Sequence, residues 1–132
     1  MARNRLAEIL LAAIGLVTLS TSLAAHHGSA AFETDPAKRI TVKGTVTEWM
    51  WANPHCWLKL DVKDDSGKVA HWVMESNNPA DLTDRGWTRQ SINVGDQVTV
   101  TARPVKNGAP AGSIVQVVLP SGQVLSTQLP KQ

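Results

Sequence analysis

Apolar and polar residues alternate from Ile40 onward, and a period of two residues is typical of a half-buried β-strand. The alternation changes phase before Trp49 and Trp51, which fall on the opposite parity. A β-bulge near Thr47 or Glu48 would restore the phase, and bulges commonly bend the strands of barrels. We therefore expect one long, bent strand at this point of the chain.

The same alternation predicts four more strands, with one short helix between the third and the fourth strand. The strands are expected at residues 55–62, 68–75, 97–103 and 112–119, followed by a short extended segment around residues 124–125. Asn78 and Pro79 suit the cap and the first residue of the helix, which ends by Gly86. The inward positions predict a core that contains Val46, Leu58, Leu60, Trp72, Val98, Val100 and Val117.

This order of elements predicts an all-β domain with one short helix. Three consecutive strands, a helix and two further strands are typical of the OB-fold, a small five-stranded and partly open barrel. A small β-sandwich is the alternative, because a sequence determines the elements better than it determines their closure. We assign the β domain to residues 40–126, with an N-terminal tail at 26–39, anchored by Phe32, and a C-terminal tail at 127–132.

Residues 1–25 have the profile of a secretory signal peptide. Arg3 and Arg5 precede a short apolar run, and small residues follow it up to Ala24 and Ala25. The apolar run is too short to predict a membrane span. Cleavage after Ala24 or Ala25 would release a small protein into the periplasm, where we expect it to be peripheral to the membrane at most.

Charge and cysteine content narrow the classes of function. The chain has 13 basic and 11 acidic residues, and two of the basic ones, Arg3 and Arg5, lie in the leader. The near balance that remains argues against a nucleic-acid partner, which normally needs a clustered basic face. Cys56 is the single cysteine, so no intramolecular disulfide forms, and we expect its thiol to be buried.

Two adjacent histidines after the leader offer a copper site that depends on where the leader is cut. Cleavage after Ala25 makes His26 the first residue of the mature chain. Its free amine and its imidazole can then chelate copper together with a second histidine, similar to a histidine brace. Cleavage after Ala24 makes His27 the third residue of the mature chain. A histidine at this position can bind Cu(II) or Ni(II) in a square-planar set of nitrogens. A solvated tail that binds nothing is the alternative. His55, at the start of the second strand, is the internal candidate for a further metal ligand.

Aromatic residues supply a second candidate site. The chain contains five tryptophans, one phenylalanine and no tyrosine. Trp51 and Trp57 flank the turn that contains Asn53, and these three residues are candidates for ligand binding at the mouth of the barrel. Glycans or a small hydrophobic ligand suit the weak charge of the chain, and core packing is the alternative role of the tryptophans.

Short motifs spread over nearly the whole chain. They are the post-leader His26-His27, the strand Gly44-Thr45-Val46, the block Trp51-Ala52-Asn53-Pro54-His55, Trp72, Gly86-Trp87, the turn Gly95-Asp96 and Leu119-Pro120-Ser121-Gly122. With these motifs the chain resembles a family of small exported bacterial proteins classed as a domain of unknown function. The resemblance implies an exported single-domain β protein and implies no catalytic activity.

Sequence motifs of common enzymes are absent from the chain. It has no metalloprotease helix motif, no nucleophile-elbow serine, no phosphate loop and no dinucleotide fingerprint. We therefore expect a non-enzymatic, periplasmic binding domain with copper as the candidate cofactor. One alternative is a module that docks on an envelope protein or a glycan through its tryptophan-rich end. The other alternative is a copper-dependent oxidoreductase with an N-terminal histidine brace.

Overall fold

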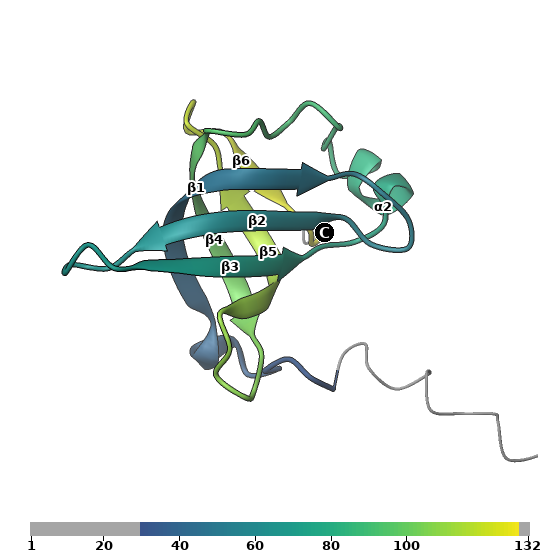
Figure 1. Ribbon diagram of the computed structural model, residues 1–132. Coiled ribbons are helices and arrows are strands. Elements are labelled where there is room, and N and C mark those ends of the chain that lie inside the picture. The colour runs from purple at the N-terminus through teal and green to yellow at the C-terminus, as the bar shows by residue number, and fades with distance from the viewer. Residues whose placement is uncertain (1–29, 130–132) are drawn as a thin grey trace, which may run out of the picture. The chain divides into compact units, whose positions relative to one another are not determined.

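Six strands and two short helices make up residues 30–129, the part of the chain that the computed structural model describes (Figure 1). In chain order they are the 3-10 helix η1 (Pro36–Lys38), β1 (Ile40–Met50), β2 (Trp57–Lys63), β3 (Val69–Glu75), α2 (Pro79–Thr83), β4 (Gln97–Pro104), β5 (Ala111–Val118) and β6 (Val124–Ser126). The strand order is β3-β2-β1-β4-β5-β6, and β3 also pairs with β5. This additional pairing closes the first five strands into a barrel, with β6 added beside β5. The predicted β domain with one short α-helix and an OB-fold-like barrel is confirmed.

Strand β1 belongs to both halves of the barrel because it bends. Its first half pairs with β4 and its second half with β2, and Thr45 takes part in both ladders. Near the bend, a Cβ atom on Gly44 would lie 2.8 Å from the backbone oxygen of Asp61, so only glycine permits this approach of the two strands. The register shifts between Val46 and Glu48, which confirms the predicted bulge.

The core fills the inside of this barrel. Six of the predicted core residues are fully buried: Val46, Leu58, Leu60, Val98, Val100 and Val117. Trp72, also predicted to be in the core, is half-buried and packs against the edge of the core. The pairing of β3 with β5 begins at Val73, so Trp72 lies beyond the seam that closes the barrel.

Helix α2 and the segment after it pack against the barrel (Figure 1). The side chain of Asn78 caps the helix by accepting a hydrogen bond of 2.9 Å from the backbone N–H of Asp81, as the sequence predicts. Trp87 follows the helix, is fully buried and donates a hydrogen bond of 2.9 Å from its indole N–H to the backbone oxygen of Ser126. This contact ties the segment after α2 to β6.

The segment before β1 lies along the connection between β4 and β5. Phe32 is buried and forms an antiparallel bridge with Val105, which confirms its expected role as an anchor. The backbone N–H of Lys106 donates a hydrogen bond of 2.9 Å to the oxygen of Ala31. None of the helices within residues 30–129 has the length and apolar character needed to span a membrane.

Candidate functional site

Charged side chains pair across the strands on the outer face of β1, β2 and β3. Nδ1 of His71 lies 2.6 Å from Oδ1 of Asp61, which is its register partner on β2. Nζ of Lys59 lies 2.6 Å from Oε2 of Glu48, its register partner on β1. The outer face of the sheet therefore carries alternating acidic and basic groups in contact with one another.

His55 takes part in a third pair at the end of this face. Its Nδ1 is in contact with Oε1 of Glu75, the last residue of β3. Backbone hydrogen bonds extend the ladder of β2 and β3 up to this point: the N–H of Cys56 donates to Asn77 at 3.0 Å, and the N–H of Ser76 donates to Cys56 at 2.8 Å. The backbone directly after the histidine is thus held by two hydrogen bonds to the end of β3.

The contact with Glu75 determines which ring nitrogen of His55 is free to coordinate a ligand. A carboxylate on Nδ1 fixes the tautomer and the ring orientation and leaves Nε2 available to coordinate a ligand, as in metal-binding histidines. The His55 side chain is 44% exposed and that of Glu75 is 18% exposed, so solvent reaches the ring while its partner is mostly covered. His71 makes a similar contact with Asp61, but these side chains are 80% and 39% exposed.

Cys56 follows His55 directly and faces the opposite way. It is fully buried, with Sγ 3.9 Å from the backbone oxygen of Ala52. Burial raises the pKa of the Cys56 thiol above its usual range, because the thiolate would lose its hydration. The predicted burial of the thiol, on the face away from His55, is confirmed.

The residues predicted for ligand binding lie around the connection between β1 and β2. Trp51 packs edge-on against Trp49, with ring centroids 5.8 Å apart, and both contact the core. Trp57 is half-buried and is the register partner of Glu75 on the outer face. Asn53 is exposed and precedes a cis peptide bond. Trp57 is therefore the member of the set that lies on the same face as the contact between His55 and Glu75.

The predicted metal ligands His26 and His27 lie outside the described residues, as does the predicted signal peptide. Within residues 30–129, no three histidine, cysteine, aspartate or glutamate side chains form a group that could hold a metal ion. His55 with its carboxylate partner can supply one imidazole nitrogen.

The contacts of the two histidines with carboxylates were not predicted from the sequence. The loop signal at residues 63–67 could have identified them, because a hairpin centred there places Asp61 opposite His71 and brings Glu75 to the start of β2. The bend of the connection that returns His55 towards Glu75 has no comparable signal in the sequence.

This fold and these contacts define a small β-barrel domain with a histidine-bearing outer face. The chain belongs to the family of unknown function DUF6152, which matches residues 13–114. The membership confirms the resemblance to a domain of unknown function. No curated protein matches the chain.

Among solved structures, the chain is similar to the mitochondrial single-stranded DNA binding protein Rim1 of S. cerevisiae. The TM-score is 0.49 at 11% sequence identity, and the match covers 67% of this chain and 94% of that chain. The prediction that excluded a nucleic-acid partner rested on the near balance of charge, and it is corrected on that ground. Net charge alone does not exclude such a partner, because single strands are bound by local grooves and stacking side chains rather than by total charge.

Proposed function

We propose that this protein is exported to the periplasm and binds Cu(II) through its mature N-terminus together with His55. The contact between Nδ1 of His55 and the carboxylate of Glu75 is the observation that carries the proposal. It orients an imidazole that solvent reaches and leaves Nε2 as the coordinating nitrogen.

The post-leader histidines supply the other nitrogen donors in this proposal. With cleavage after Ala25, the free amine and the imidazole of His26 form a chelate; with cleavage after Ala24, His27 stands third. Both arrangements offer the nitrogen ligands that Cu(II) favours in a tetragonal geometry. A single domain imidazole is too few ligands for a tight site, so His55 adds to the N-terminal donors rather than replacing them.

The anchor of the N-terminal segment supports this role. The bridge between Phe32 and Val105 ties the chain to the barrel five residues after His27. Five extended residues span at most about 17 Å. Chain connectivity therefore keeps the proposed N-terminal donors within this distance of Phe32.

Isothermal titration of Cu(II) into the processed protein tests the proposal. We expect one equivalent of copper to bind, and a steep loss of affinity when one extra residue precedes the native start, because that residue displaces the amine from the chelate. Affinity should also fall as the pH drops through the imidazole and amine titrations, since protons compete for the same nitrogens. A protein with one extra residue after Gln132 is the control. Equal, weak binding by all three proteins would contradict the proposal.

A further inference from the structure

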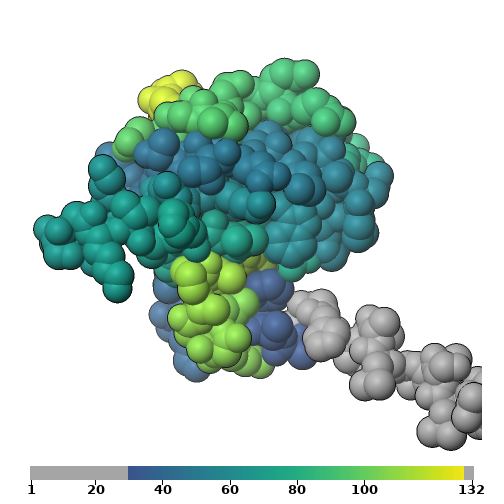
Figure 2. Space-filling model, in the orientation of Figure 1, coloured from purple at the N-terminus to yellow at the C-terminus, as the bar shows by residue number. Residues whose placement is uncertain are grey.

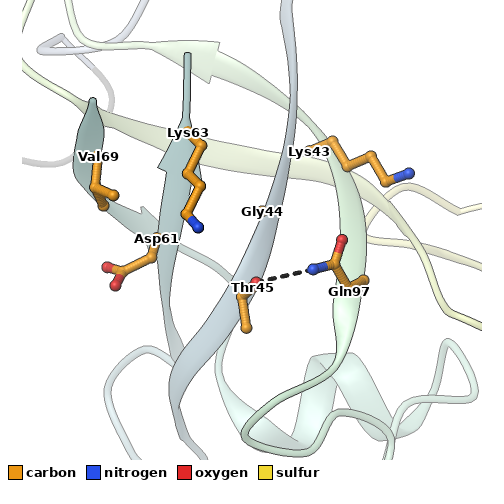
Figure 3. Close-up of a pocket in the computed structure, with 7 residues that line it drawn as sticks. All are labelled: Lys43, Gly44, Thr45, Asp61, Lys63, Val69 and Gln97. Atoms are coloured by element: carbon orange, nitrogen blue, oxygen red, sulfur yellow. Dashed lines mark hydrogen bonds between the residues drawn. The ribbon is translucent and has the colours of Figure 1, made fainter. Parts of the chain in front are cut away.

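A hollow of about 460 Å³ opens on the outer surface between β1 and β2, at the base of the β2–β3 hairpin (Figure 3). The tip of this hairpin stands clear of the rest of the domain (Figure 2). The volume falls within the range of small-molecule sites. The residues that line the hollow are Lys43, Gly44, Thr45, Asp61, Lys63, Val69 and Gln97.

The hollow exists because β1 and β2 part at one residue pair. Their ladder ends at Thr45 and Asp61, and the first half of β1 turns away to pair with β4. Gly44 lies next to the last pair, and its lack of a side chain allows β1 to contact the backbone of Asp61 at the edge of the hollow.

The charges around the gap are predominantly positive. Lys63 extends over the gap towards Gly44, whereas the carboxylate of Asp61 turns away from it (Figure 3). That carboxylate lies 2.6 Å from Nδ1 of His71. Among residues 30–129, neither Lys63 nor Lys43 has an acidic partner within ion-pair distance.

The hydroxyl group of Thr45 is a second donor at the hollow, beside the ammonium group of Lys63. The side-chain amide of Gln97 donates a hydrogen bond of 3.1 Å to Oγ1 of Thr45, so the threonine keeps its own proton to donate to a ligand. Carboxylate and phosphate oxygens accept such bonds, and they do so most strongly from a charged donor.

We propose that this hollow binds a small organic molecule through a carboxylate or phosphate group. Lys63 is the main charged contact and Thr45 is the hydroxyl donor, while Lys43, on the other side of β1, adds to the positive potential. The site is independent of the proposed copper ligands, because it lies at the end of β2, whereas His55 precedes the start of that strand.

Two-dimensional ¹H–¹⁵N NMR titrations of the processed protein, at constant ionic strength, test this proposal. The probes are sodium citrate and, in a separate arm, sodium phosphate. We expect saturable shifts of the backbone amides of Gly44 and Thr45 and of the side-chain amide of Gln97. Saturation by citrate alone assigns a carboxylate ligand, and saturation by phosphate alone assigns a phosphate ligand.

Two lysine variants complete the test. Lys63→Ala should weaken binding about tenfold or more, the loss expected for a hydrogen bond to a charged group. Lys106→Ala removes an exposed lysine on the β4–β5 connection and should leave the affinity unchanged. Native-like spectra of both variants establish that they fold. Shifts that grow linearly with both probes, or equal affinity of Lys63→Ala and the native protein, would overturn the proposal.

Discussion

Glu75 holds the Nδ1 atom of His55 across the end of the β2–β3 ladder. The residue after this histidine, Cys56, is fully buried, and its backbone is paired with Ser76 and Asn77. The imidazole is therefore carried by a rigid part of the barrel while its ring stays in contact with solvent. For the proposed copper site, such an arrangement would lower the entropic cost of coordination, because the imidazole is oriented before the metal binds.

The predicted leader gives the first test. Expressed with its full sequence in a Gram-negative host, the protein should appear in the periplasmic fraction without residues 1–24 or 1–25. Mass spectrometry of the intact protein identifies the first residue. Recovery of the uncleaved chain from the membrane fraction would mean that this segment is an anchor.

The different burial of Trp87 and Trp72 predicts that replacing each with alanine lowers the free energy of unfolding by different amounts. Trp87→Ala should lower the free energy of unfolding by about 3–5 kcal/mol, because it removes a fully buried ring. It also removes the hydrogen bond to Ser126. Trp72→Ala should cost less, since Trp72 is half-buried. Urea unfolding measures both values, and an equal or larger cost at Trp72 would contradict the packing described here.

The close approach of β1 to β2 predicts that Gly44 tolerates no side chain. A Cβ atom at this position would lie 2.8 Å from the oxygen of Asp61 and 2.9 Å from Cγ2 of Val62. Gly44→Ala should therefore lower the free energy of unfolding by about 1–3 kcal/mol, the usual cost of overpacking. Lys43→Ala, at the exposed neighbouring position, is the control and should be nearly neutral in urea unfolding. An unchanged midpoint for Gly44→Ala would show that the strands do not approach in this way.

The buried thiol predicts a pH dependence of stability. The raised pKa of Cys56 means that the unfolded chain releases this proton first as the pH rises. The stability linked to the thiol is thus complete below about pH 8.5 and is lost as the pH rises through the higher pKa of the folded state. In the variant Cys56→Ala, the free energy of unfolding should not show this decrease at high pH. Iodoacetamide should alkylate the native protein far more slowly than the urea-unfolded chain, and equal rates would rule out burial.

Much of the fold could be predicted because one face of each strand is buried. Alternation of apolar residues located all five strands of the barrel, and the phase change before Trp49 located the bulge in β1. The predicted strand at residues 55–62 begins at Trp57 instead, since the connection that contains His55 is held by the pairing of Cys56 rather than by a regular ladder. The helix ends at Thr83, before the predicted boundary, because the N–H groups of Arg85 and Gly86 bond three residues back instead of four.

The candidate site was less accessible from the sequence. Which face His55 occupies follows from its parity with Cys56, and this inference agrees with the structure. Its contact with Glu75 depends on a bend in the chain, and the hollow beside Gly44 depends on where two strands part. Both are properties of tertiary geometry, and the alternation of residues carries no information on either.

Cu(II) titration of three processed proteins tests the central claim most directly. The native protein, His55→Ala and His71→Ala should be compared by isothermal titration under one buffer condition, with His71→Ala as the matched control because it removes an imidazole of a similar carboxylate pair. We predict that His55→Ala weakens copper binding, whereas His71→Ala leaves it unchanged. Identical affinities for the native protein and His55→Ala would contradict the account and would exclude His55 from the copper site.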